Sequence, residues 1–185
     1  MIWWPTEIPT LQHGLLSLRP ANDADIVEVY QACQDPLIPK FTTVPADYTM
    51  ADAKFFIRDK GPSHFFEKKE LLFVITHGHR SEAVFCGVIS FHTINLENHG
   101  AELGYWIAAP ERGKGIGTNA ANMITEYGFT TLGFRRIEAL VDVENEPSKA
   151  LLISAGYKLE GIMHRKVTRA DGSQKDMALF ARVND

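Results

Sequence analysis

The sequence predicts a single mixed α/β domain, and three features of the chain carry this prediction. Three β-rich runs joined by short polar connectors, residues 71–77, 83–94 and 101–108, are typical of antiparallel hairpins. A glycine-rich loop then leads from the third run into a helical pattern, as a crossover to a parallel strand requires. A further strand, a short helix and two closing strands complete the predicted order of elements.

The length and composition of the chain limit the classes of protein it can belong to. At 185 residues and 45% hydrophobic content, the chain can bury one substantial core, so residues 1–185 are expected to form one domain. Its formal net charge of −4 argues against broad electrostatic binding to nucleic acid or to an anionic membrane. No apolar run approaches the roughly 20 residues that span a bilayer, and the N-terminus lacks the pattern of a signal peptide.

The two cysteines indicate a reducing environment. Cys33 and Cys86 each lie in an apolar context, and two lone cysteines form neither a disulfide framework nor a metal-binding pattern. The histidines between residues 64 and 99 show no ligand spacing either. We therefore expect a cytoplasmic protein without a metal site.

The segments before the hairpins predict one strand and several helices. Residues 14–20 alternate as a strand that Pro20 ends, and residues 21–35 have the apolar spacing of a helix. A loop containing three prolines is expected next. Residues 49–69 then predict one or two helices, broken at the sequence KGPS.

The segments after the glycine loop predict a second set of elements. A helix is expected to begin at about Gly117 and to end at Gly133. Residues 135–145 alternate as a strand, and residues 146–156 form a short helix with a proline near its first turn. Residues 157–183 then predict two strands around the turn ADGSQ.

The loop RGKGIG at residues 112–117 indicates an anion site. A helix start offers unpaired backbone N–H groups and the positive end of the helix dipole, which together stabilise a phosphate. Glycines allow those N–H groups to converge without obstruction by Cβ atoms, and two cations add positive charge. The residues concerned are Arg112, Gly113, Lys114, Gly115 and Gly117.

Neither of the two best-known phosphate loops fits this sequence. The P-loop needs a Lys followed by Ser or Thr after its last glycine, whereas here Thr118 and Asn119 follow Gly117. The dinucleotide fingerprint needs the spacing G-x-G-x-x-G, whereas this loop has the spacing G-x-G-x-G.

The pattern Arg112-x-x-Gly115-x-Gly117 after the strand LGYWI resembles the acyl-CoA pyrophosphate loop of the GNAT superfamily of N-acetyltransferases. The sequences AELGYWI, SAGYKLEG and ADGSQKDMALFARV, together with Asn145-x-x-Ser148, resemble the RimJ/RimL-type branch, whose members acetylate the N-terminal amine of ribosomal proteins. This resemblance covers about residues 10–183.

The resemblance implies a fold and a co-substrate. The fold is a single mixed, largely antiparallel twisted sheet of about seven strands, with helices on both faces and splayed central strands that hold acyl-CoA. The co-substrate is acetyl-CoA. Asn145 would bond its pantetheine arm unless it only caps a helix, and backbone groups near Trp106 and Ile107 would bond the same arm as an added strand does. The implied CoA-binding residues are Trp106, Ile107, Arg112, Gly113, Lys114, Gly115, Ile116, Gly117, Thr118 and Asn145.

The resemblance also implies the catalytic groups of direct acetyl transfer to an amine. In many members a Tyr seven residues after the Asn protonates the thiolate, but here that position holds Leu152. Ser148 then becomes the candidate acid, the alternative being a plain helix cap. Glu102 matches the position of the family's general base, the alternative being a salt-bridged strand residue. His92 could act as the base at neutral pH, although a structural histidine is the simpler interpretation. Tyr105 is interpreted as an ordinary aromatic residue of the core or of the acceptor cleft.

The acceptor amine is the open part of this interpretation. The resemblance favours the α-amine of a protein, such as a ribosomal protein. A small amine, such as a polyamine, an aminoglycoside or an amino acid, is the alternative, because variable loops form the acceptor cleft. A non-catalytic acyl-CoA sensor is a third possibility. The expected partners are acetyl-CoA and the amine, with neither nucleic acid nor membrane, and the protein is expected to be a monomer or a homodimer.

Overall fold

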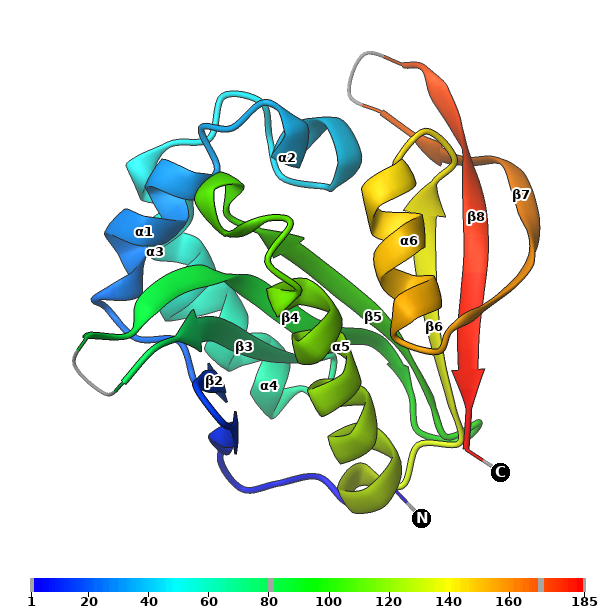
Figure 1. Ribbon diagram of the computed structural model, residues 1–185, viewed down its shortest axis with the longest axis horizontal. Helices are drawn as coiled ribbons and strands as arrows, with labels where there is room; N and C mark the ends of the chain where they lie inside the picture. The colour runs from blue at the N-terminus through cyan, green and yellow to red at the C-terminus, as the bar shows by residue number, and fades with distance from the viewer. Residues whose placement is uncertain (1, 80–81, 170–171, 185) are drawn as a thin grey trace.

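The computed structural model describes residues 2–79, 82–169 and 172–184, and these ranges form an eight-stranded sheet with helices on both faces (Figure 1). The strand order is β1-β2-β3-β4-β5-β6-β8-β7. The mixed α/β prediction is therefore confirmed, with eight strands in place of about seven. The strands are β1 (Leu11–His13), β2 (Leu16–Arg19), β3 (Glu70–His77), β4 (Val84–Asn95), β5 (Gly100–Ile107), β6 (Arg136–Asp142), β7 (Lys158–Thr168) and β8 (Gln174–Val183).

The additional strand is β1, which the sequence did not reveal because it has only three residues. It forms a hairpin with β2 through a turn at Gly14, whose φ of 59° is the left-handed conformation that glycine adopts without strain. The predicted strand 14–20 is correspondingly shorter at its start. Part of the predicted ADGSQ turn, Ala170 and Asp171, lies outside the described residues.

Two predictions about the helices were wrong. The proline-containing loop holds a one-turn helix, because Pro39 lies in its first turn, where a missing N–H removes no intrahelical bond. The expected break at KGPS is continuous helix, since Gly61 keeps right-handed helical angles between a π-helical turn and α4. The helices are α1 (Asp25–Ala32), α2 (Leu37–Phe41), α3 (Met50–Phe55), α4 (Gly61–Phe66), α5 (Ile116–Tyr127) and α6 (Glu146–Ser154).

The core lies on both faces of the sheet. On one face, buried side chains of α5 and α6, such as Ile124 and Leu152, pack against β3, β4 and β6. On the other face, Val29 of α1 and Ala53 of α3 form a second cluster that reaches Trp106 of β5. No helix in the described ranges is long and apolar enough to cross a bilayer.

The prediction that Gly133 ends a helix is confirmed. Gly133 ends the helical segment after α5 with a φ of 80°. Both cysteines are free and buried, and burial raises the pKa of the Cys33 thiol to about 12.

Gly128, at the end of α5, tests how tightly α5 packs against the sheet. A Cβ there would lie 2.8 Å from Cζ of Phe91 and 3.0 Å from Cδ1 of Ile137, and both side chains are fully buried. We expect Gly128→Ala to lower the free energy of unfolding by about 1–3 kcal/mol, since overpacking outweighs the gain in helix propensity. Gly161→Ala in β7 meets nothing within 4 Å and should change it by less than about 0.5 kcal/mol. Urea denaturation measures the free energy of unfolding of both variants, and an equal loss in the two would contradict the packing argument.

Candidate functional site

The sheet opens between β5 and β6, the only parallel neighbours among the described strands. Their pairing ends at Glu102 and Glu138, whereas β5 continues to Ile107 and β6 to Asp142. Figure 1 shows the two strands diverging beyond this point. The edge of β5 that faces β6 is therefore unpaired over its last residues, and such an edge can bond an extended ligand as an added strand would.

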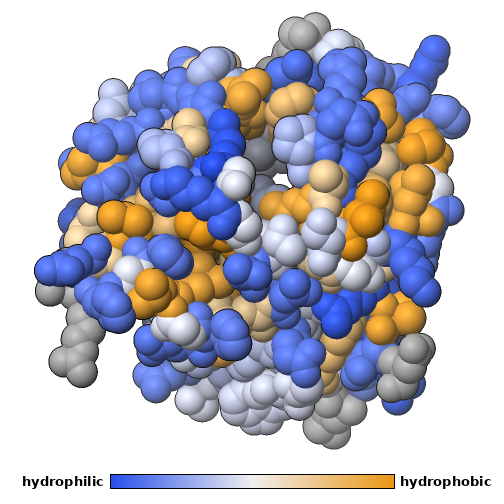
Figure 2. All heavy atoms as spheres, in the orientation of Figure 1, coloured by the Kyte–Doolittle hydropathy of each residue, from blue (hydrophilic) through white to orange (hydrophobic). Residues whose placement is uncertain are grey.

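A cavity of about 1260 Å³ occupies this opening. It reaches from the glycine loop, past the last residues of β5 and β6, to α2 and α3 on the opposite face. Figure 2 shows the surface hollowed between the loop before α5 and α6, with apolar atoms at the rim. The splayed strands, the glycine loop and the first turn of α6 thus border one continuous space.

The glycine loop has the geometry of an anion cradle. Gly113 and Gly115 have φ values of 72° and 76°, and a Cβ at either residue would meet nothing within 4 Å. Gly115 is the N-cap of α5, and neither a capping side chain nor an acidic residue is present in the first turn. The first intrahelical bond runs from Asn119 N–H to Gly115 C=O. The N–H groups that precede Asn119 in this first turn therefore have no partner within the helix, and they lie at the positive end of the helix dipole.

Gly117 serves packing as well as the loop. A Cβ on it would lie 2.6 Å from Cδ1 of Leu151 on α6 and 3.2 Å from Cγ1 of Ile107 on β5. Any larger residue would therefore push α5 away from the strand that it follows. Ile116 and Thr118, the other predicted CoA-binding residues of this turn, also line the cavity.

The two cations of the loop are already paired. Arg112 donates from Nε to the Ile107 carbonyl at 2.8 Å, and its guanidinium contacts the Asp35 carboxylate. It thereby fastens the loop to the end of β5 and to the segment after α1. Lys114 pairs with Glu111 at 3.0 Å and is not among the residues that line the cavity. Direct contact of either side chain with CoA stays a prediction.

The side chains at the end of β5 alternate between the two faces of the sheet. Trp106 packs against Phe85 at a ring-centroid distance of 5.9 Å, toward α1 and α3. Ile107 lies in the core beneath α5. The predicted contact of their backbone groups with the pantetheine arm stays a prediction, and the Ile107 carbonyl already accepts from Arg112.

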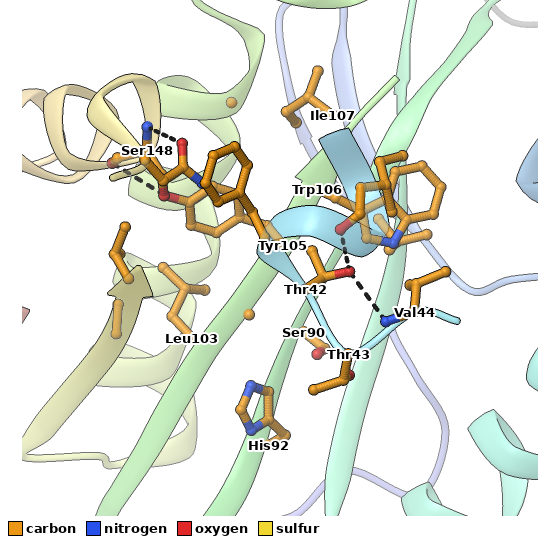
Figure 3. Close-up of a pocket in the computed structure, with 18 of the residues that line it drawn as sticks. Thr42, Thr43, Val44, Ser90, His92, Leu103, Tyr105, Trp106, Ile107 and Ser148 are labelled. Atoms are coloured by element: carbon orange, nitrogen blue, oxygen red, sulfur yellow. Dashed lines mark hydrogen bonds between the residues drawn. The ribbon is translucent and has the colours of Figure 1, made fainter. Parts of the chain in front are cut away.

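Ser148 and Asn145 have different roles at the start of α6. The Asn145 side chain is the cap, since its Oδ1 accepts from the Ser148 N–H at 3.2 Å. The Ser148 hydroxyl is consequently free of capping and meets the Tyr105 hydroxyl at 2.7 Å (Figure 3). Leu152, at the position of the usual catalytic Tyr, is fully buried in the core.

Tyr105 extends from β5 across the opening to α6. Burial raises the pKa of its phenol to about 12, and the hydrogen bond with Ser148 opposes that rise in part. The phenol is therefore protonated at neutral pH, and the pair offers hydrogen-bond donors to a group in the opening. The sequence interpretation missed this role. Alternation along β5 could have suggested it, because Tyr105 lies on the face of α5 and α6, opposite to Trp106.

Glu102 and His92 face each other across β4 and β5 on the other side of the sheet. They form a cross-strand pair, and Glu138 lies opposite Glu102 on β6. Burial raises the pKa of the Glu102 carboxyl, Glu138 adds to the rise, and His92 opposes it. The two candidate bases thus lie together at the start of the splay, on the face opposite to Ser148. In the described ranges, no group of His, Cys, Asp and Glu is arranged to hold a metal ion.

Comparison with known proteins identifies the family of this chain. Residues 16–158 match the model of the acetyltransferase (GNAT) domain. The chain belongs to the GNAT family. An uncharacterized N-acetyltransferase, p20 of Bacillus licheniformis, is 31% identical over 172 residues, which cover 93% of this chain and 94% of p20.

Two further proteins bear on the activity of this GNAT chain. The spermidine N(1)-acetyltransferase of Escherichia coli is 25% identical over 80% of this chain and 76% of its own length. The structure of Mycobacterium smegmatis RimJ in complex with CoA-disulfide matches with a TM-score of 0.82 and 25% identity, covering 97% of this chain and 88% of RimJ. The predicted RimJ/RimL-type branch is thus confirmed among the structural neighbours.

Proposed function

We propose that this protein acetylates the N-terminal α-amine of a protein, with acetyl-CoA as the acyl donor. The observation that carries the proposal is the continuous opening between β5 and β6, which joins the glycine loop to the Ser148–Tyr105 pair. The diphosphate of CoA belongs at the N-terminus of α5, and its pantetheine arm lies along the unpaired edge of β5. The thioester then reaches the first turn of α6.

The acceptor approaches from the opposite face. Glu102 and His92 lie there, at the point where the strands part, and Ser148 lies on the α6 face. A proton acceptor and a hydrogen-bond donor on opposite sides of the opening suit an amine that attacks a carbonyl held between the strands. Glu102 or His92 removes a proton from the ammonium so that its nitrogen becomes nucleophilic.

The departing sulfur is stabilised at α6. The N-terminus of α6 presents its positive dipole end, and Ser148 donates a hydrogen bond to the sulfur while Tyr105 holds that hydroxyl. The ammonium nitrogen loses two protons in the complete reaction. One goes to the base and then to water, and the other moves through the hydroxyl pair to the sulfur. The C–N bond forms, the C–S bond breaks, and the products are the acetylated amine and free CoA.

A protein N-terminus fits the acceptor side of the cavity. This side extends over the segment Thr42–Val44 to α3, and Figure 3 draws this segment between the side chains of Trp106 and His92. The similarity to RimJ supports the same class of acceptor. A polyamine is the second candidate, because the residues that line the cavity include the carboxylates Glu70 and Glu102, and because the spermidine acetyltransferase is a relative over most of the chain.

The acceptor class can be tested by release of free thiol from acetyl-CoA. We expect turnover with peptides that begin with Ser, Ala or Met, and none with the same peptides blocked at the α-amine, because a blocked amine cannot attack. Spermidine, an aminoglycoside and free amino acids complete the panel. Turnover with spermidine alone would support the second candidate. Binding of CoA without thiol release for any amine would contradict the proposed transfer.

The donor site can be tested at the glycine loop. Gly115→Val forces a β-branched residue into the left-handed region and directs its side chain toward the proposed diphosphate. We expect CoA to bind at least tenfold more weakly in calorimetric titration, with a stability loss of only about 1–2 kcal/mol. Gly117→Val provides the contrast, since its clash with Leu151 should lower the melting temperature further. Unchanged CoA affinity in Gly115→Val would refute the diphosphate site.

The hydroxyl pair can be tested with Ser148→Ala and Tyr105→Phe. We expect Ser148→Ala to lower kcat by about ten- to a thousandfold with little change in affinity for acetyl-CoA. Tyr105→Phe keeps the ring and removes only the phenol, so it should give a smaller decrease. Because the two hydroxyls act together, the double variant should be no slower than Ser148→Ala. Normal turnover in Ser148→Ala would remove Ser148 from the reaction.

A further inference from the structure

Thr93 has a strained backbone at the edge of the proposed acceptor site. Its φ is 50°, and among the described non-glycine residues with positive φ it is the one with a β-branched side chain. It follows His92 where the pairing of β4 with β5 becomes irregular, between His92 and Asn95. In a regular strand, consecutive side chains point to opposite faces, and an irregularity of this kind redirects one of them.

The redirected hydroxyl of Thr93 lies between two titratable groups. Its Oγ1 is 2.9 Å from Nδ1 of His92. Thr93 also lowers the pKa of the Glu102 carboxyl, the cross-strand partner of His92, against the larger effect of burial. A threonine hydroxyl has one proton to donate. If that proton goes to the Glu102 carboxylate, the Thr93 oxygen accepts from His92, and Nδ1 must carry the imidazole proton.

This arrangement determines which nitrogen of His92 is basic. With the proton on Nδ1, the lone pair of the neutral ring is on Nε2. Nε2 lies over Gly104 of β5, where a Cβ would be only 2.6 Å away. Gly104 is adjacent to Tyr105, whose phenol meets Ser148, and it is two residues beyond Glu102, the last residue of β5 that pairs with β6. The lone pair therefore lies next to the position where the thioester is placed.

We propose that His92 is the general base of the acetyl transfer, and that Thr93 and Glu102 are positioning residues that hold it with Nε2 unprotonated. The inference rests on the proposed function and deepens it. Nε2 takes one proton from the acceptor ammonium, and the lone pair left on the amine nitrogen forms the C–N bond. The imidazolium that results is stabilised through Thr93 by the Glu102 carboxylate, and it returns its proton to water.

Other charged groups surround His92 from every neighbouring strand. Glu70 of β3 is its cross-strand partner, but its two oxygens accept from Ser90 at 2.8 Å and contact His64 at 3.2 Å. Glu102 faces it from β5. Glu138 of β6 and Lys166 of β7 act on Glu102 with opposite sign. Cross-strand carboxylates therefore lie on both sides of His92.

The tautomer of His92 can be measured without knowing the acceptor. Two-bond ¹⁵N–¹H correlation spectra distinguish protonated from unprotonated ring nitrogens, and His92→Gln assigns the His92 signals among the seven histidines. We expect the neutral ring with the proton on Nδ1 in the complex with CoA. Thr93→Val keeps the branched shape and removes the hydroxyl, so it should abolish that preference. A proton on Nε2, or an unchanged spectrum in Thr93→Val, would overturn the inference.

The kinetic test uses the best acceptor of the panel described above. We expect His92→Gln to lower kcat/KM by about a hundred- to ten-thousandfold and to remove the rising limb of the pH profile. Glu102→Gln should retain that limb but shift it to lower pH, because the imidazolium loses a neighbouring negative charge. His13→Gln, on the exposed strand β1, is the matched control and should leave the profile unchanged.

The two levels of the proposal fail in different ways. If Gly115→Val retains CoA affinity and Ser148→Ala retains turnover, the donor site and the transfer mechanism are wrong. If both variants behave as expected but the rising limb survives in His92→Gln and disappears in Glu102→Gln, Glu102 is the base and only the assignment of His92 is wrong.

Discussion

The early end of the pairing between β5 and β6 is the constraint on which the site depends. Two parallel strands that stayed paired would leave no room for a ligand and no free backbone groups at the centre of the sheet. Because pairing stops at Glu102 and Glu138, the rest of β5 has one unpaired edge. Antiparallel pairing with β4 along the other edge keeps that part of β5 extended, so the edge is rigid and needs no ordering before a ligand binds.

The divergence also gives the two faces of the sheet different chemistry. Alternation along β5 directs Tyr105 toward α6, where Ser148 meets it, and leaves Glu102 and Gly104 on the face of His92. A substrate between the strands therefore meets neutral hydroxyls on one side and ionisable groups on the other. This separation prevents the base from sharing its proton directly with the Ser148–Tyr105 pair.

The sequence was sufficient for the order of elements, the glycine loop and the fold, because these depend on local patterns and on a motif at fixed spacing. It was insufficient where contacts join distant segments. The pairing of Tyr105 with Ser148 joins residues 43 positions apart, and Arg112 is fastened to Asp35 across the site. β1 and α2 were missed because three or five residues carry too little periodicity to detect. The left-handed backbone of Thr93 has no sequence signal, since threonine seldom adopts it.

The strain at Thr93 indicates why the base differs from a simple carboxylate. Glu102 is buried, and burial together with the neighbouring Glu138 carboxylate raises its pKa, so this carboxyl is easier to protonate than an exposed one. The His92 imidazole beside it meets Thr93 through Nδ1, which leaves Nε2 to accept a proton. A left-handed threonine costs on the order of 1–3 kcal/mol, and such strain persists only where surrounding contacts hold it. Here one contact that holds it is the hydrogen bond between the Thr93 hydroxyl and Nδ1 of His92, which also orients the imidazole. The strain at Thr93 and the orientation of His92 are therefore linked.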